Sequence, residues 1–195
     1  MKTAVLLLGQ TRTAKQCFFS QYDKVLRYLP HAEIFAFVED DAQAADLPPL
    51  LAQRFAPEQI HFEKRKTPDE LPQPDESHAD YVPYARSGNL ATATRTLVRT
   101  YWHFNAAWQW FWPQSDGFEL IVKMRPDTYI HDFTLPHMPE PNEAFGCWWA
   151  RCGGFNDRMA FYGRKAACAA QTTQRPASLP AAASIFPNGS GAFNS

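Results

Sequence analysis

Short apolar runs alternate with amphipathic segments in the first third of the chain, and this alternation constrains the fold more than any other feature. Residues 2–8 and 32–38 are mainly aliphatic or aromatic runs bounded by glycine or acids. Such runs are typical of strands that are buried on both faces of a sheet. Between them, large apolar side chains recur at helical spacing from Phe18 to Leu29 and stop at Pro30. This order of strand, helix and strand predicts a parallel sheet with right-handed crossovers.

Local signals predict where the helices begin and where the next strand lies. Thr13 and Gln16 have the spacing of a capping box at the start of the first helix. Asp46 is placed to cap a second helix, which we expect to end before Pro57. Residues 59–63 then form a third short strand, which completes a β-α-β-α-β order.

The second half of the chain predicts one long helix and further short strands. Residues 89–112 carry aromatic side chains at helical spacing, with Pro113 as a stop, and predict a helix whose rings lie mostly in the core. Residues 118–124 predict another buried strand. Two shorter strands are expected at 145–150 and 159–162.

Together these elements predict an α/β fold, a single Rossmann-like domain over residues 1–168 with a mostly parallel central sheet flanked by helices. A chain of 195 residues is long enough for one such core. Residues 63–86 are rich in proline and acids and predict a long loop, which is either a lid over the substrate or a solvated insertion. The low complexity of residues 169–195 predicts a weakly ordered tail.

Charge and composition argue against several classes of protein. The formal net charge of -1 lacks the attraction that nucleic-acid binding needs, although a local basic patch could still hold a compact phosphate. We therefore expect no nucleic-acid partner. The first apolar run is too short for a signal peptide or a membrane span, which predicts a cytoplasmic protein without a transmembrane segment. The cysteines form no Cys-x-x-Cys pair, which favours free thiols over a zinc site.

Polar residues that follow the apolar strands are the candidates for a binding site, because ligands of open α/β sheets bind beyond the carboxyl ends of the strands. Three sets stand out: Gly9, Gln10, Thr11 and Arg12; Arg125 and Asp127; and Asp157 and Arg158 beside a Gly-Gly turn. The first set combines a sharp turn, the N–H groups of a helix start and a guanidinium, which suits a nucleotide or its diphosphate. A structural turn with an exposed arginine is the alternative, since neither the Walker nor the Gly-x-Gly-x-x-Gly spacing is present.

Two interpretations of Arg125 and Asp127 remain open on the sequence alone. Pro126 fixes the backbone between them, and their opposite charges are typical of a local ion pair at a strand end. Alternatively, Asp127 is an oxygen ligand for Mg²⁺ or Mn²⁺, or holds a ribose hydroxyl, while Arg125 meets phosphate. Asp40 and Asp41 after the second strand are likewise either an acidic turn or part of a nucleoside or metal site.

The sequence also resembles a known family at these positions. The segments GQTRT, IVKMRPDTYI and GGFNDRMAFYG, with the long aromatic helix, are similar to those of a family of bacterial and viral proteins assigned as glycosyltransferases. The similarity covers roughly residues 3–168. It implies a GT-A-like fold, in which an Asp-x-Asp motif binds a divalent metal and the diphosphate of a nucleotide sugar. Because Arg125 stands where that motif has its first acid, the resemblance implies Mn²⁺ or Mg²⁺ at Asp127 but leaves the metal dependence open.

The resemblance further implies transfer of a sugar from a nucleotide-sugar donor to a glycan or another hydroxyl acceptor, in glycan or polysaccharide biosynthesis. In such a reaction Arg12, Arg125 and Arg158 would offset the charge of the departing diphosphate. Asp127 would be a catalytic residue that works with a metal, the ribose or the sugar. Asp157 is the candidate base for the acceptor hydroxyl, with a capping or turn role as the alternative. Two other functions remain open: a non-catalytic nucleotide- or glycan-binding domain, and a sugar-phosphate nucleotidyltransferase.

Overall fold

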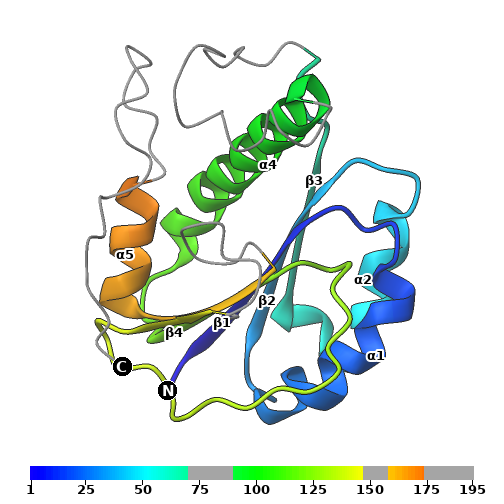
Figure 1. Cartoon of the computed structure of the whole chain (residues 1–195). Coiled ribbons are helices and arrows are strands. Elements are labelled where there is room, and N and C mark those ends of the chain that lie inside the picture. The colour runs from blue at the N-terminus through cyan, green and yellow to red at the C-terminus, as the bar shows by residue number, and fades with distance from the viewer. Residues whose placement is uncertain (70–89, 147–157, 174–195) are drawn as a thin grey trace.

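The computed structural model describes residues 1–69, 90–146 and 158–173 as an α/β fold built on a six-stranded sheet (Figure 1). The strands lie in the order β3-β2-β1-β4-β6-β5, with the bounds Ile60–Arg65, Glu33–Glu39, Thr3–Gly9, Leu120–Met124, Met159–Gly163 and Ala144–Gly146. β3, β2, β1 and β4 are parallel, and β6 runs antiparallel to both of its neighbours. The predicted β-α-β-α-β order and the mostly parallel sheet are confirmed.

Helices cover both faces of this sheet (Figure 1). One face carries α1 and α2, and the other carries α4 and α5, with the bounds Ala14–Lys24, Leu47–Leu51, Leu90–Phe111 and Arg164–Thr173. Alternate residues of β1 belong to the two layers, Val5 to the buried cluster under α1 and Leu6 to the cluster under α4. Burying a large apolar side chain contributes about 1.5–3 kcal/mol. The two layers therefore hold the strand ends firmly in place.

α1 begins where the sequence predicts it but ends at Lys24, short of the predicted stop at Pro30, and the predicted capping box is wrong. The side chain of Thr13 makes no capping hydrogen bond, and its backbone, at φ -125° and ψ 16°, is not in the extended conformation of a usual cap. The carbonyl of Thr13 instead accepts the N–H groups of Gln16 and Cys17, each at 3.1 Å. After Lys24 the chain continues into a short 3-10 turn, η1 (Leu26–Tyr28), before β2.

α2 is shorter than predicted, and Asp46 does not cap it. A 3-10 turn, η2 (Ala44–Asp46), comes directly before the helix. A capping side chain accepts N–H groups from the second or third helical residue, and in α2 these are Pro48 and Pro49, which have none. Just before this turn, the carboxylate of Asp41 accepts the N–H of Gln43 at 2.9 Å.

β3 is longer than predicted, which moves the start of the following loop. A 3-10 turn, η3 (Pro57–Gln59), leads into the strand. Glu63 pairs opposite Phe37 and Arg65 opposite Glu39, so the loop boundary at residue 63 is wrong. The apolar pattern ends early because charged side chains are common on an edge strand whose backbone still pairs. The rest of the predicted loop or lid, residues 70–86, lies outside the described residues.

The aromatic side chains of α4 form much of the second core, as predicted. Phe104, Trp108 and Phe111 are buried against the sheet, whereas Tyr101 is 42% exposed. The 3-10 turn η5 (Trp112–Gln114) contains Pro113 and ends the helix. β4 begins at Leu120, two residues later than predicted. β5 coincides with the start of the strand predicted at 145–150, whose residues 147–150 lie outside the described residues.

α5 corrects the prediction that the chain is weakly ordered from residue 169. The helix continues to Thr173, and Ala167 is fully buried in the cluster under α4. Low complexity is misleading at this point because alanine has the highest helix propensity and its small side chain packs closely. Residues 174–195 of the predicted tail lie outside the described residues.

The described residues also bear on the state of the cysteines and on membrane-spanning helices. Cys17 and Cys168 carry free thiols, as predicted, while Cys147 and Cys152 lie outside the described ranges. Across residues 1–69, 90–146 and 158–173, none of the helices has both the length and the apolar character needed to cross a membrane.

Candidate functional site

The candidate site lies where the sheet changes its direction of winding. From β1 the chain passes through α1 to β2 on one side, whereas β4, on the other side of β1, follows β3 and α4. β1 and β4 are parallel neighbours, with Leu7 opposite Met124 near their carboxyl ends. Doubly wound sheets bind ligands in the crevice at such a switch point. The topology therefore directs attention to the residues just beyond these two strands.

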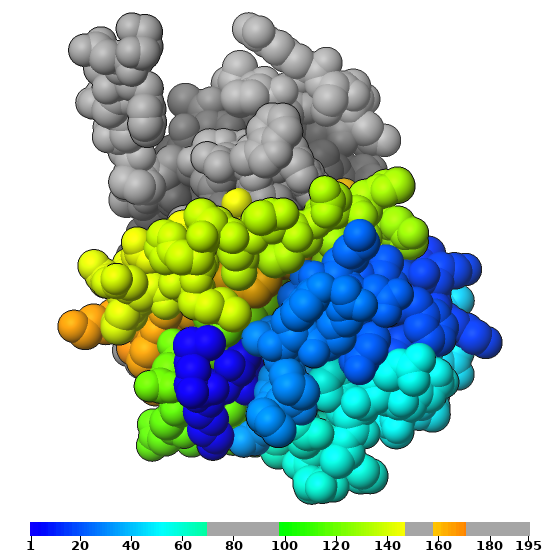
Figure 2. Space-filling view, turned by 90° about the horizontal axis from the view of Figure 1, so that it is seen from below, coloured from blue at the N-terminus to red at the C-terminus, as the bar shows by residue number. Residues whose placement is uncertain are grey.

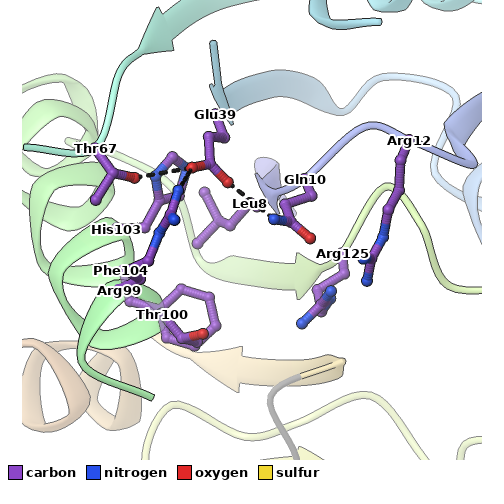
Figure 3. Close-up of a pocket in the computed structure, with 11 residues that line it drawn as sticks. Leu8, Gln10, Arg12, Glu39, Thr67, Arg99, Thr100, His103, Phe104 and Arg125 are labelled. Atoms are coloured by element: carbon purple, nitrogen blue, oxygen red, sulfur yellow. Dashed lines mark hydrogen bonds and ion pairs between the residues drawn. The ribbon is translucent and has the colours of Figure 1, made fainter. Parts of the chain in front are cut away.

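A pocket of about 290 Å³ opens at this switch point (Figure 3). Among the described residues, its charged lining consists of three arginines and one carboxylate: Arg12, Arg99, Arg125 and Glu39. Gly9 and Gln10 also line it, so the predicted binding residues after β1 and β4 converge. Figure 3 shows Arg12 beside Arg125 at one end, while Gln10, Thr67 and Arg99 surround Glu39 at the other.

Gly9 makes the sharp turn that the sequence predicts at the end of β1. Its φ is 119°, in a region that residues with a side chain rarely adopt. The turn brings the backbone of Gln10 and Arg12 over the carboxyl edge of the sheet, where both line the pocket.

Arg125 and Asp127 form a two-pronged ion pair. Nε of Arg125 donates to Oδ1 of Asp127 and Nη2 donates to Oδ2, both at 2.8 Å. Nε of Arg12 lies 3.5 Å from Oδ2 of the same carboxylate. The side chain of Asp127 is 5% exposed, whereas that of Arg12 is 64% exposed. The two strand ends thus meet at one carboxylate, and the ion-pair interpretation of Arg125 and Asp127 is confirmed.

The electrostatics of Asp127 follow from this geometry. Burial raises the pKa of Asp127, but the hydrogen bonds and charge of Arg125, with the charges of Arg12 and Arg158, outweigh it. The net effect is a pKa below the ordinary value of an aspartate, so the carboxylate is ionised at neutral pH. Its charge holds the guanidinium of Arg125 at the pocket wall.

Gln21 is a residue of this site that the sequence interpretation missed. It lies on the buried face of α1 with 2% exposure, and its Nε2 is within hydrogen-bonding distance of three carbonyls: those of Arg125 at 3.0 Å, Pro126 at 3.0 Å and Thr128 at 2.7 Å. The segment that begins there, residues 125–146, is the yellow-green band that lies beside the blue first part of the chain in Figure 2. Gln21 therefore ties the loop that carries Arg125 and Asp127 to α1. The signal was present, since a glutamine occupies an apolar position of the helical repeat.

Gln21→Leu is expected to lower the free energy of unfolding by about 2 kcal/mol, because the substitution keeps the volume but leaves buried carbonyls without a donor. Chemical denaturation of both proteins measures this loss. Gln16→Leu, at an exposed position of the same helix, is the matched control and should change stability by less than about 0.5 kcal/mol. Equal stability of Gln21→Leu and the wild type would show that Gln21 does not hold the loop.

Glu39 and Arg99 are two more pocket residues that were not selected from the sequence. Glu39 ends β2, and its carboxylate accepts hydrogen bonds from Gln10 at 3.0 Å, from Thr67 at 3.1 Å and from Arg99 of α4 (Figure 3). Burial raises the pKa of Glu39, but these hydrogen bonds outweigh it and keep the pKa below the ordinary value. Glu39 thus joins the ends of β1 and β3 to α4 across one end of the pocket.

Thr11 and the acids after β2 form a structural turn. Asp41 accepts the backbone N–H of Thr11 at 3.1 Å and its hydroxyl. Burial raises the pKa of Asp41, but the hydrogen bonds from Thr11, Gln43 and Ala44 outweigh it and lower the pKa. Asp40 pairs with Lys64 at 3.0 Å. The acidic-turn interpretation of Asp40 and Asp41 therefore accounts for their contacts, and Thr11 supports the pocket without lining it.

His103 lines the pocket beneath α4, and Lys123 lies behind this wall against Phe104. Nε2 of His103 lies 3.2 Å from the carbonyl of Phe37, and burial lowers the pKa of the imidazole even though this hydrogen bond opposes the shift. The ring is therefore neutral at neutral pH. Lys123, buried in β4, places its ammonium 4.5 Å from the centre of the Phe104 ring. Phe104 and His103 both line the pocket.

The third predicted set is only partly described. Asp157 lies outside the described residues, so its assignment as a base stays a prediction. The carbonyl of Arg158 accepts the backbone N–H of Arg125 at 2.8 Å, and its charge contributes to the low pKa of Asp127. Arg158 is thus close to the ion pair, although it is not among the residues that line the pocket.

The described residues do not offer a ready metal site at the place that the family resemblance indicates. Among them, no group of three or more histidine, cysteine, aspartate or glutamate side chains is arranged to share an ion. Both oxygens of Asp127 already accept hydrogen bonds from Arg125. The groups that surround this carboxylate are guanidiniums, and positive charges attract an anion rather than Mg²⁺ or Mn²⁺.

The fold and the pocket together define an α/β protein with an arginine-rich pocket at a sheet switch point. No family model matches the chain, and a search of curated proteins found no significant match. The geometry of this pocket is therefore the basis for assigning a function.

Proposed function

We propose that this chain is a glycosyltransferase with a GT-A-like fold, which moves a sugar from a nucleotide diphosphate donor to a hydroxyl acceptor such as a glycan. One observation carries the proposal: Gly9, Arg12 and Arg125, from strands far apart in sequence, line a single pocket at the switch point between β1 and β4. Parallel sheets of this winding bind nucleotides at that place.

The charges of the pocket suit a diphosphate. Arg12, Arg99 and Arg125 face two carboxylates, Glu39 and Asp127, so the cluster keeps an excess of positive charge. When the sugar leaves, negative charge grows on the departing diphosphate, and preorganised guanidinium groups lower the barrier by stabilising that charge. The two contacts of Asp127 fix the orientation of Arg125 before the donor binds, which reduces the reorganisation needed during the reaction.

The pocket also has a part suited to the uncharged portion of a donor. Phe104, Leu8 and neutral His103 give its α4 side a largely apolar wall, and Glu39 adds a carboxylate that can accept hydrogen bonds from hydroxyl groups. Small-molecule sites combine such apolar walls with a few polar groups. Asp157 remains the proposed base for the acceptor hydroxyl.

A panel of nucleotide sugars tests the proposal, assayed with and without Mn²⁺ and with a mixture of glycan acceptors. The expected result is sugar transfer, or slow donor hydrolysis, for one donor class, and kcat/KM about tenfold lower in Arg12→Gln. Arg27→Gln is the matched control, because Arg27 is exposed after the far end of α1 and does not line the pocket. Absence of turnover with every donor would contradict the proposal.

One observation favours a second candidate, a non-catalytic nucleotide-binding domain. Asp127, the acid expected to take part in catalysis, is engaged by Arg125 on both oxygens. The same panel separates the two functions, since a binding domain would retain nucleoside diphosphates without turning over any donor. Release of pyrophosphate from a nucleoside triphosphate and a sugar phosphate would instead indicate a nucleotidyltransferase.

A further inference from the structure

The carboxylate oxygens of Asp127 contact arginine side chains, which is unlike the open coordination of a metal ligand. Arg125 approaches both carboxylate oxygens at 2.8 Å, and Arg12 adds a third contact at 3.5 Å. A divalent cation bound to these oxygens would compete with these contacts and would lie against two positive charges. Because the carboxylate side chain is only 5% exposed, little of its surface remains for hydrated Mg²⁺, which gives up its water reluctantly.

Two other carboxylates near the switch point also accept hydrogen bonds from neighbouring residues. Glu39 accepts hydrogen bonds from Gln10, Thr67 and Arg99, and Asp41 accepts them from Thr11 and Gln43. In each case the oxygens hold the ends of strands and helices together. These acids therefore serve as structural anchors within the described part of the site.

We infer that the diphosphate of the donor is held by Arg12 and Arg125 without a divalent cation, and that Asp127 is a positioning residue that orients Arg125. The inference rests on the proposed function and specifies how that site recognises its donor. A guanidinium group pairs with phosphate through two parallel hydrogen bonds, so two fixed arginines supply the charge that a metal would otherwise provide. Arg12, with 64% of its side chain exposed, can move onto the anion as it enters.

Titration calorimetry with inorganic pyrophosphate tests this inference on the full chain, in EDTA and in excess Mg²⁺. Pyrophosphate carries no base or sugar, so the result does not depend on which donor the enzyme uses. We expect binding in EDTA, and we expect Arg12→Gln to weaken it about tenfold or more by removing a charge-assisted contact. Arg12→Gln avoids the folding problem of Arg125→Gln, which would leave Asp127 buried without its main partner. Arg27→Gln removes the same charge at the opposite edge of the sheet and should bind as the wild type does.

The outcomes distinguish this inference from the proposed function. Binding in EDTA that Arg12→Gln weakens and Arg27→Gln does not supports arginine recognition. Binding only in the presence of Mg²⁺ overturns the inference, while sugar transfer in the donor panel would still stand. Equal weakening by Arg12→Gln and Arg27→Gln also overturns it, because the attraction would then be a general effect of charge. Binding in neither buffer overturns it as well, and the donor panel then reports separately on the transfer reaction.

Discussion

Asp127→Ala is expected to lower the free energy of unfolding by about 3 kcal/mol and the Tm by about 6–12 °C, a large effect for a single substitution. The reason is that Arg125, whose side chain is 19% exposed, loses the carboxylate that accepts both of its hydrogen bonds. A nearly buried charge without a partner is costly. Chemical denaturation and thermal melting of the two proteins measure the loss.

Asp40→Ala is the matched control for this stability prediction. Asp40 also follows a strand and pairs with a cation, Lys64, but both side chains are well exposed, so its removal should cost less than about 1 kcal/mol. A double variant, Arg125→Met with Asp127→Ala, should recover part of the loss because no unpaired charge remains. An Asp127→Ala protein as stable as the wild type would show that the ion pair does not stabilise the strand ends.

The pH dependence of stability provides a second readout of the same contact. Arg125 keeps the pKa of Asp127 below its ordinary value of 3.8, so the unfolded chain takes up a proton more readily than the folded one. The stabilisation is therefore fully present above about pH 4 and is lost as the pH falls through the folded pKa. The wild type should lose stability more steeply than Asp127→Ala in this acidic range.

Arg125→Gln is expected to reduce kcat by about 100-fold or more with the donor that the panel identifies. Loss of a single preorganised donor to a developing negative charge typically costs this much. Lysine should not restore the rate, because its ammonium lacks the planar fork that pairs with Asp127 and with phosphate together. Assays are run below the melting range of each variant, so that loss of folding is not counted as loss of catalysis.

Two variants indicate whether the effect is specific to the pocket. Arg12→Gln should raise KM and lower kcat/KM about tenfold, since Arg12 reaches the donor from an exposed position. Arg27→Gln should leave both constants unchanged. If Arg125→Gln folds normally and turns over at the wild-type rate, Arg125 has no part in stabilising the leaving group.

The central part of the fold was predictable from local patterns because these patterns have a direct physical cause. The runs that became β1, β2 and β4 are buried on both faces, so nearly every residue is apolar and the signal is strong. The edge strand β3 was underestimated because its last residues carry charges. The cap at Thr13 was misjudged because side-chain identity does not reveal backbone angles. The missing cap at Asp46 could have been recognised in the sequence, since Pro48 and Pro49 have no N–H to donate.

The candidate site was predictable only in the parts that follow strands in sequence. Gly9, Arg12 and Arg125 could be selected because the carboxyl ends of parallel strands share one edge. Arg99 and Gln21 reach the site from helices, and a helical sequence alone does not show which neighbour a polar side chain will meet. The sequence left the pairing of Arg125 with Asp127 as one of two alternatives, and the two 2.8 Å contacts in the structure decide for the ion pair.

A crystal structure of the protein soaked with a nucleoside diphosphate in EDTA tests the central claim most directly. The account predicts that the diphosphate lies in the switch-point pocket, with the guanidinium groups of Arg12 and Arg125 within hydrogen-bonding distance of its oxygens. A diphosphate bound elsewhere on the protein, with this pocket holding only solvent, would contradict it.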